Sequence, residues 1–131
     1  YYEPTVILTN NSANIAQEEL FGPVLTCVIF DKETEAISIA NDTKYGLAAS
    51  IWTENLGRAH SVASNLDCGI IWINDHHKND PSSPWGGFKE SGVGRENGYE
   101  AYMQYTHTRS IIANYSRKFD DWFSDQASRY S

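Results

Sequence analysis

Short apolar runs separated by amphipathic segments dominate the first half of the chain. The runs are rich in β-branched and aromatic side chains, which is typical of buried strands. The predicted strands cover residues 5–8, 24–30, 47–52 and 70–73. Between them, apolar residues recur at helical spacing in residues 34–41 and again after Thr53, which we expect to be an N-cap. This order of elements predicts an α/β fold, a parallel-type sheet with covering helices.

Periodicity is lost between residues 74 and 95, a segment that is long for a loop in a compact domain. Because Trp85 and Phe88 lie within it, we expect an ordered, functional loop. After this loop, residues 96–104 are predicted to form a helix and residues 106–114 a final strand.

The C-terminal tail has a different pattern. Apolar and aromatic residues share one helical face there, namely Phe119, Trp122, Phe123, Ala127 and Tyr130. We therefore divide the chain into a main part at 1–105, a strand at 106–114 and an aromatic tail at 115–131. No role is assigned to the tail.

Composition and charge limit the possible partners. The 131 residues are enough for one domain with a modest core, and 40% of them are hydrophobic. The net charge is −7, and no basic cluster is longer than Arg117-Lys118, which argues against binding to nucleic acid or to an anionic membrane. No signal-peptide pattern opens the chain, and Cys27 and Cys68 are too few for a disulfide scaffold. We expect reduced cysteines and a cytoplasmic location.

The glycine-rich segment from Gly87 to Gly98 fits neither common nucleotide-binding motif. A P-loop would require Lys and Ser or Thr where Val93 and Gly94 stand. A dinucleotide fingerprint would require a shorter spacing than that of Gly92, Gly94 and Gly98, and a strand directly before it. These glycines are therefore interpreted as turn and close-packing residues.

Other candidate residues allow more than one interpretation. The side chains of the adjacent His76 and His77 diverge and lack a surrounding ligand set, so polar loop residues near a pocket are favoured over a metal site. Cys27 and Cys68 have no neighbouring His or Lys that would activate a nucleophile. The acidic turn at 18–23 is either a solvated turn with one aromatic residue in the core or a loop that presents carboxylates to a ligand. Composition alone favours the solvated turn.

Five segments together resemble the NAD(P)+-dependent aldehyde dehydrogenase superfamily, in its order and at its spacing. They are Tyr-Glu-Pro-Thr-Val at 2–6, Glu-Glu-Leu-Phe-Gly-Pro-Val at 18–24, Asn-Asp-Thr-Lys-Tyr-Gly-Leu-Ala-Ala at 41–49, Gly-Ile-Ile-Trp-Ile-Asn at 69–74 and Pro-Trp-Gly-Gly-Phe-Lys-Glu-Ser-Gly-Val-Gly-Arg-Glu at 84–96. The similarity covers residues 1 to about 114, so the chain resembles the C-terminal portion of such an enzyme.

The resemblance implies a cofactor site for NAD or NADP. It assigns Glu19 to the nicotinamide ribose hydroxyls, and a carboxylate is able to accept hydrogen bonds from both of them. Phe21 is assigned a place beside the nicotinamide ring.

The resemblance also implies that the loop forms one wall of an aldehyde pocket. The residues expected to face the substrate are His76, His77, Asn79 and Trp85. The sequence Pro-Trp-Gly-Gly is similar to that of betaine and ω-aminoaldehyde dehydrogenases, in which this Trp belongs to an aromatic box. A Trp face attracts a quaternary ammonium by a cation–π interaction. The remainder of the loop does not match those enzymes well, so the aldehyde stays open.

The resemblance also has implications for assembly and for catalysis. Residues 106–114 resemble the strand with which family members build oligomers, so a homo-oligomer is expected. The family's nucleophilic Cys and its general base Glu lie upstream of every motif found here. We therefore expect this chain to be inactive alone. The alternatives are a non-catalytic assembly or regulatory domain derived from an aldehyde dehydrogenase, and an unrelated aromatic-rich binding module.

Overall fold

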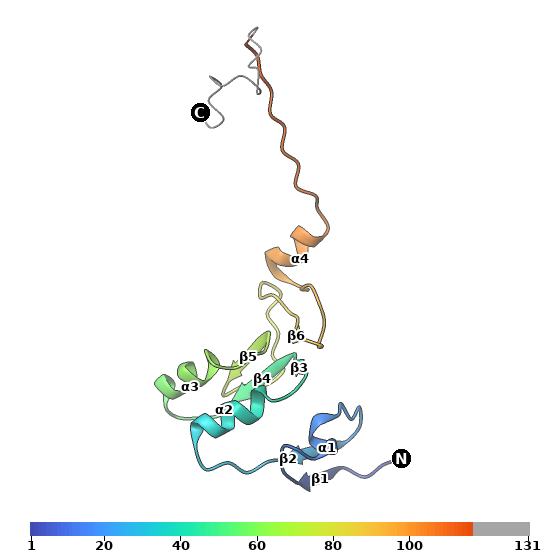
Figure 1. The fold of residues 1–131 in the computed structure, drawn as a ribbon, viewed down its shortest axis with the longest axis vertical. Coiled ribbons are helices and arrows are strands. Elements are labelled where there is room, and N and C mark those ends of the chain that lie inside the picture. Colours follow the sequence, from blue (N-terminus) through green and yellow to red (C-terminus); the bar gives the residue numbers. More distant parts are fainter. Residues whose placement is uncertain (117–131) are drawn as a thin grey trace, which may run out of the picture.

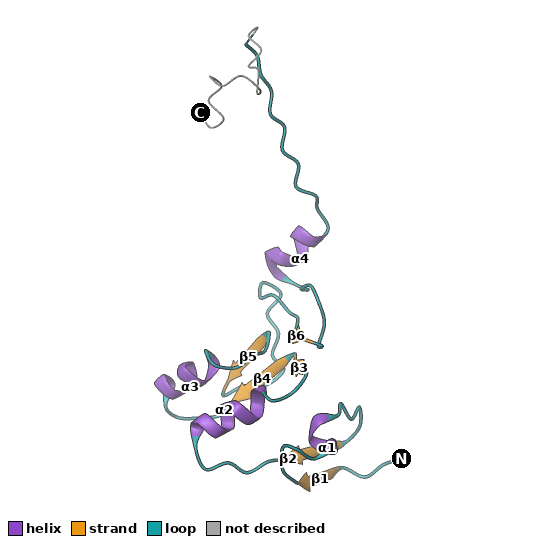
Figure 2. Ribbon diagram, viewed as in Figure 1, coloured by secondary structure: helices purple, strands orange, loops and turns teal. Residues whose placement is uncertain are grey.

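The four predicted strands all form, but they pair two by two (Figures 1 and 2). The computed structural model describes residues 1–116. In it, β1 (Thr5–Leu8) runs parallel to β2 (Val24–Cys27), and β4 (Ala48–Ile51) runs parallel to β5 (Ile70–Ile73). Within these residues no strand pairing joins the two units. The parallel direction is therefore confirmed, whereas the expected single sheet is replaced by separate pairs.

Helices make the connections that parallel strands require. The short α1 (Asn14–Gln17) lies between β1 and β2, and α3 (Leu56–Ala63) lies between β4 and β5. The two units are linked by α2 (Glu33–Asn41), close to the predicted 34–41. Residues of α2, β4 and α3 surround a hollow of about 540 Å³, so both helices flank the second strand pair.

A small antiparallel pair, which the sequence did not predict, joins the long loop to the body. β3 (Tyr45–Gly46) pairs with β6 (Phe88–Lys89), with Gly46 opposite Phe88. Each strand has two residues, too few to show an alternating pattern. This pair closes residues 47–87 into one unit that contains β4, α3 and β5.

Several boundaries differ from prediction for local reasons. β2 ends at Cys27 instead of residue 30, because β1 is only four residues long and the pairing ends where Thr9 N–H donates to the Cys27 carbonyl. The N-cap of α3 is Asn55 and not Thr53: Asn55 Oδ1 accepts from Arg58 N–H at 2.9 Å. Thr53 Oγ1 instead accepts from Asn55 N–H at 3.2 Å.

Beyond the loop, the chain leaves the body. α4 (Gly98–Gln104) starts two residues later than predicted, because Glu96 is extended and paired with Trp85. The segment 106–114 pairs with no strand of the described chain and projects away from the body (Figure 1). The predicted final strand is therefore not confirmed. The helical face predicted for the tail lies outside the described residues.

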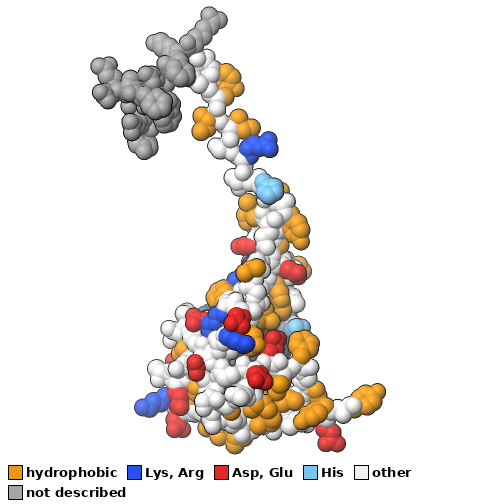
Figure 3. Space-filling view, turned by 45° about the vertical axis from the view of Figure 1, so that its right-hand side comes forward, with side chains coloured by type: hydrophobic (Ala, Val, Ile, Leu, Met, Phe, Trp, Pro, Cys, Tyr) orange, Lys and Arg blue, Asp and Glu red, His pale blue; other side chains and the backbone are white. Residues whose placement is uncertain are grey.

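Very little of the described chain is enclosed. Ala59 is the only hydrophobic residue classed as buried among residues 1–116, whereas Val6, Leu8 and Leu25 remain 60–68% exposed. Apolar side chains are open on the body and along the extended segment (Figure 3). Apolar surface of this extent is typical of faces that meet further protein. Among the described helices, none is long and apolar enough to cross a membrane.

Candidate functional site

Four aromatic rings gather where β5 enters the long loop. We call Trp72, His76, His77 and Trp85 the four-ring cluster. The ring centroids of Trp72 lie 5.5 Å from His76, 6.4 Å from His77 and 5.9 Å from Trp85. His77 meets Trp85 at 5.9 Å with an interplanar angle of 89°, an edge-to-face arrangement that aromatic rings prefer. The structure thus brings together three of the four residues expected to face the substrate.

The position of the cluster follows from the parallel pairing of β4 and β5. Ser50 is opposite Trp72 in the register, and both lie near the carboxyl ends of their strands. In open α/β sheets, ligands bind beyond this edge, because the loops that follow parallel strands converge there. The two imidazoles come from the loop directly after β5, which places them at the same edge.

Polar contacts fix the orientation of the rings. Ser50 Oγ lies 2.9 Å from Nδ1 of His76, so β4 supports a ring that belongs to the loop. The indole N–H of Trp72 donates to the Lys78 carbonyl at 2.9 Å, which folds the loop back over the strand. The His76 N–H donates to Asp75 Oδ1 at 2.8 Å. The cluster is therefore held by both strands and by the loop itself.

Both ends of the loop are anchored. At the first end, the Asn74 side chain exchanges two hydrogen bonds of 2.9 Å with the backbone of Thr53. At the other end, Trp85 and Glu96 exchange backbone hydrogen bonds of 2.6 and 2.7 Å. Trp85 also borders a hollow of about 580 Å³ that extends toward α4.

A close backbone approach holds the second end against β5. A Cβ on Gly69 would collide with the Gly86 carbonyl oxygen, so only a glycine allows the loop to lie this near the strand. The neighbouring Gly87 is buried. These contacts fix the backbone next to Trp85 against β5 and so help to position the Trp85 ring among the other rings.

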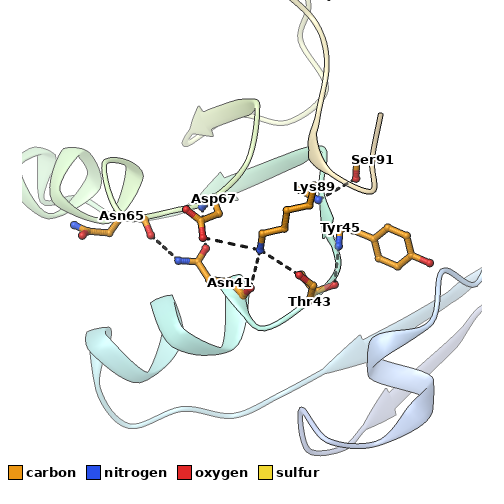
Figure 4. Close-up of polar contacts among 8 residues, drawn as sticks. Asn41, Thr43, Tyr45, Asn65, Asp67, Lys89 and Ser91 are labelled. Atoms are coloured by element: carbon orange, nitrogen blue, oxygen red, sulfur yellow. Dashed lines mark hydrogen bonds and ion pairs between the residues drawn. The ribbon is translucent and has the colours of Figure 1, made fainter. Parts of the chain in front are cut away.

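A lysine network braces the base of the loop (Figure 4). Lys89 Nζ donates to the carbonyls of Asn41 at 2.7 Å and Thr43 at 3.1 Å, and it lies 4.0 Å from Asp67 Oδ2. The Asn41 amide connects to the same region, since it donates to the Asn65 carbonyl at 2.7 Å and accepts from Asp67 N–H at 2.8 Å. With only 27% of its side chain exposed, Lys89 ties β6 to the end of α2.

The acidic turn lies on the other strand pair and is open to solvent. Glu19 is exposed and Phe21 is 100% exposed, so the expectation that composition favoured, an aromatic residue in the core, is wrong within this chain. Successive short turns, from Gly22 N–H to the Leu20 carbonyl and from Val24 N–H to the Gly22 carbonyl, shape the segment. Among the described residues, the Glu19 carboxylate makes no hydrogen bond or ion pair, so both oxygens are available to donors.

Residues in and just before α1 anchor the chain that leads into the acidic turn. Gln17 Nε2 donates to the carbonyls of Asn11 at 2.8 Å and Asp42 at 3.0 Å. Asn11 in turn donates to Asp42 Oδ2 at 2.7 Å. The residues that precede Glu19 are thus fixed to the end of α2, although the Glu19 carboxylate has no partner within residues 1–116.

Asn79 and Asp80 form the outer part of the loop. Asn79 is exposed and belongs to none of the ring contacts of the four-ring cluster. Asp80 Oδ1 accepts from Ser82 N–H and from Ser82 Oγ, both at 2.8 Å. The backbone hydrogen bond, followed by that from the hydroxyl, lowers the pKa of the Asp80 carboxyl below its ordinary value of 3.8.

The two cysteines are free thiols in half-buried positions. Burial raises the pKa of the Cys68 thiol above its ordinary value of 9.0, and the thiol donates to the Ile70 carbonyl at 3.4 Å. A protonated thiol is a poor nucleophile. Within residues 1–116 there is also no group of three or more His, Cys, Asp or Glu residues able to hold a metal ion.

Two residues of the site were missed from the sequence. Trp72 was interpreted only as part of a buried strand, and Ser50 was not singled out. The signal that identifies Trp72 is its place two residues before the loop, at the carboxyl end of a parallel strand. Ser50 carries no such signal, because its contact with His76 depends on strand pairing.

Comparison with known proteins assigns the chain to a family. Residues 1–111 match the aldehyde dehydrogenase family. The chain belongs to this family.

The similar proteins include several dehydrogenases. The betaine aldehyde dehydrogenase of Bacillus subtilis (strain 168) is 43% identical over 125 residues, which cover 95% of this chain and 26% of that protein. The structure of Staphylococcus aureus betaine aldehyde dehydrogenase with NAD+ matches with a TM-score of 0.88 at 45% identity, over 95% of this chain and 25% of that one. A structure of indole-3-acetaldehyde dehydrogenase with NAD+ matches with a TM-score of 0.82 at 50% identity, over 85% of this chain and 23% of that one. The chain therefore spans about a quarter of the length of these relatives.

Proposed function

We propose that this chain is the C-terminal portion of an NAD(P)+-dependent aldehyde dehydrogenase and supplies one wall of its aldehyde pocket. The whole enzyme would convert an aldehyde, NAD(P)+ and water to a carboxylate and NAD(P)H. The observation that carries the proposal is the four-ring cluster, because it gathers His76, His77 and Trp85 on the loop that the family resemblance assigns to the substrate. Membership of the family adds support.

The acidic turn fits a role in holding the cofactor. Within the described part of the chain neither carboxylate oxygen of Glu19 has a partner, and the two oxygens suit a pair of ribose hydroxyls. Phe21 is fully exposed, so a ring face is open to stack against a planar group. When bound, the nicotinamide supplies the hydride acceptor. The residues of this chain orient that ring, and related dehydrogenase structures contain NAD+.

The catalytic nucleophile and base are proposed to come from outside this chain. Cys68 is unsuited to attack a carbonyl because burial keeps its thiol protonated. We expect residues 1–131 alone to produce no NAD(P)H from any aldehyde. Turnover that copurifies with the isolated chain, and that is lost on substitution of Cys27 or Cys68, would contradict this assignment.

Assembly is proposed to involve residues 106–114. This segment is extended and lies away from the body, with Ile111 81% exposed and Ile112 94% exposed. Between residues 107 and 113 the backbone pairs with no strand of the described chain, and an extended segment of this kind is able to add to the sheet of another chain. We propose that it adds a strand to a neighbouring subunit in a homo-oligomer. A cytoplasmic location is in keeping with the two free cysteines.

The cofactor assignment is tested by a matched pair of variants in the intact enzyme. Glu19→Gln removes the carboxylate, whereas Glu18→Gln makes the same change on the preceding exposed residue. We expect Glu19→Gln to slow hydride transfer in a single turnover by about tenfold, with a smaller effect on NAD+ affinity, because ribose contacts orient the ring. Equal rates in the two variants would remove Glu19 from the cofactor site.

The pocket assignment is tested with two tryptophans. Trp85→Ala opens the four-ring cluster, whereas Trp52→Ala removes a 69% exposed indole beyond the end of β4. We expect Trp85→Ala to raise the KM for the aldehyde and to leave the KM for NAD+ nearly unchanged. If the KM for the aldehyde responds alike to both variants, Trp85 does not face the substrate.

The same variants distinguish this proposal from the alternative, a non-catalytic assembly or regulatory domain. It predicts that neither Glu19→Gln nor Trp85→Ala alters the kinetics of a partner dehydrogenase. The pocket proposal predicts that both do, each on a different constant.

A further inference from the structure

A serine of β4 determines which nitrogen of His76 is left for a ligand. Ser50 is half-buried on the strand opposite Trp72, and its Oγ lies 2.9 Å from Nδ1 of His76. Within residues 1–116 the Ser50 hydroxyl has no other hydrogen-bond partner. The nitrogen that does not contact Ser50 is Nε2, so this atom of His76 is the one available to a substrate.

The direction of this hydrogen bond follows from what each group is able to donate. A neutral imidazole has one N–H and one bare nitrogen, whereas a hydroxyl both donates and accepts. If the ring donated from Nδ1, the proton of the half-buried Ser50 would have no acceptor within the described chain. If Ser50 donates instead, both groups are satisfied and the ring proton is on Nε2. An imidazolium also donates from Nε2, so this nitrogen is a donor in either charge state.

Further contacts hold the His76 ring so that Nε2 keeps one direction. The His76 N–H donates to Asp75 Oδ1 at 2.8 Å, and the ring centroid lies 5.5 Å from that of Trp72 and 6.0 Å from that of His77. Nδ1 faces β4 through Ser50, so Nε2, across the ring, faces away from that strand. Among the described residues no group accepts a hydrogen bond from Nε2. A donor that is held in place in this way loses little conformational entropy when a ligand binds.

The charge of the loop indicates which kind of acceptor suits this donor. With both histidines neutral, residues 74–85 have a net charge of −1, from Asp75 and Asp80 (−2) and Lys78 (+1). A carboxylate on the ligand would be repelled by this loop, whereas an ether, hydroxyl or carbonyl oxygen has no charge. The N–H of His76 therefore suits an uncharged oxygen.

We propose that Ser50 is a positioning residue that directs the Nε2–H of His76 at the substrate, and that this N–H selects aldehydes whose tail has an uncharged acceptor oxygen. This inference rests on the proposed function of the loop as a wall of the aldehyde pocket. The rings of Trp72 and Trp85 lie on the same wall and offer apolar surface to the rest of such a tail.

Two aldehydes of the same shape isolate the contact with the oxygen. (Tetrahydropyran-4-yl)acetaldehyde and cyclohexylacetaldehyde differ in a single ring atom, an ether oxygen in place of a methylene group. The quantity measured is the ratio of kcat/KM for the ether to kcat/KM for the cyclohexyl aldehyde, with NAD+ and the intact enzyme. A general loosening of the loop would lower both values and leave this ratio unchanged, whereas loss of the N–H donor lowers the ratio.

Variants of the two residues assign the ratio to their hydrogen bond. We expect Ser50→Ala to lower the ratio by about fivefold, the effect of one hydrogen bond between uncharged groups, and Ser50→Thr, which keeps a hydroxyl, to restore it. His76→Phe keeps a ring beside Trp72 without the donor and should lower the ratio at least as far. It also decides the question if Ser50→Ala does not fold. The matched control is Ser64→Ala, which removes an exposed hydroxyl that donates to the His60 carbonyl and should leave the ratio unchanged.

The outcomes separate the inference from the proposed function. A folded Ser50→Ala or His76→Phe enzyme with the ratio of Ser64→Ala would overturn the inference, as would a ratio that stays low in folded Ser50→Thr. An enzyme that oxidises other aldehydes but not the ether would overturn it as well. In each of these cases aldehyde oxidation persists, so the proposed function stands. An intact protein that oxidises no aldehyde would overturn the proposed function and the inference together.

Discussion

Asn74 and Thr53 are joined by a reciprocal pair of hydrogen bonds across the ends of two parallel strands. Asn74 Oδ1 accepts from Thr53 N–H, and Asn74 Nδ2 donates to the Thr53 carbonyl, both at 2.9 Å. Asn74 also adopts a φ of 53°, a left-handed conformation that Asn tolerates better than most residues. The side chain and the backbone of this one residue together direct the loop from β5 toward the four-ring cluster.

Substitution of Asn74 should therefore impair both stability and substrate binding. We expect Asn74→Ala to lower the free energy of unfolding of the intact enzyme by about 2–4 kcal/mol, from two lost hydrogen bonds and a strained φ. Asn74→Gly loses the hydrogen bonds alone and should cost less, because glycine accepts this φ. Denaturant unfolding measures both, and the KM for the aldehyde should rise in the same order. A larger loss for Gly than for Ala would refute the role given to the backbone conformation.

Lys89 should contribute more to stability than its neighbour Lys44. Lys89→Met removes charge-assisted hydrogen bonds to two backbone carbonyls from a side chain that is only 27% exposed. We expect a loss of roughly 1.5–3 kcal/mol in the free energy of unfolding of the intact enzyme. Lys44→Met, which breaks an exposed ion pair with Glu90, is the control and should have little effect. Similar losses in the two variants would mean that the Lys89 network does not stabilise the base of the loop.

The stability of the turn at Asp80 should decrease when the pH is lowered. Its carboxyl has a pKa below 3.8 in the folded chain, so its stabilising effect is fully present above pH 3.8. That effect is lost as the pH falls through the lowered pKa. The amide chemical shift of Ser82, followed by NMR in the intact enzyme, should titrate with a midpoint below 3.8.

The cause of this shift can be tested by removal of the hydroxyl. Since the backbone hydrogen bond is the largest contribution, the pKa of Asp80 in Ser82→Ala should still lie below 3.8. A midpoint that returns to 3.8 in Ser82→Ala would assign the effect to the side chain instead.

The extended segment 106–114 should control assembly. We expect truncation of the intact enzyme after Tyr105 to reduce the oligomer, because it removes the exposed Ile111 and Ile112 and an extended segment that pairs with no strand of the described chain. Sedimentation equilibrium measures the change. A truncation after Asn114 removes the tail alone and is the control. An unchanged oligomer after the longer truncation would place the interface elsewhere.

Local sequence was sufficient for most elements of the body. The apolar runs at 5–8 and 70–73 became strands with the predicted bounds, since their β-branched and aromatic side chains fit a pleated, half-buried surface. The helix predicted at 34–41 formed within one residue of its expected start. The sequence also singled out three of the residues that the four-ring cluster brings together, His76, His77 and Trp85.

Tertiary structure decided the features that depend on partners distant in the sequence. The sequence could not show that 45–46 would pair with 88–89, because two-residue strands have no pattern of their own. Ser50 became part of the site only because β4 pairs with β5 in one register, and a slip of one residue would have turned its side chain to the other face. The segment 106–114 has a strand-like composition and yet pairs with no strand of the described chain. The N–H and C=O groups of a strand need hydrogen-bond partners on a neighbouring strand, and amino-acid composition does not determine whether such a strand is present.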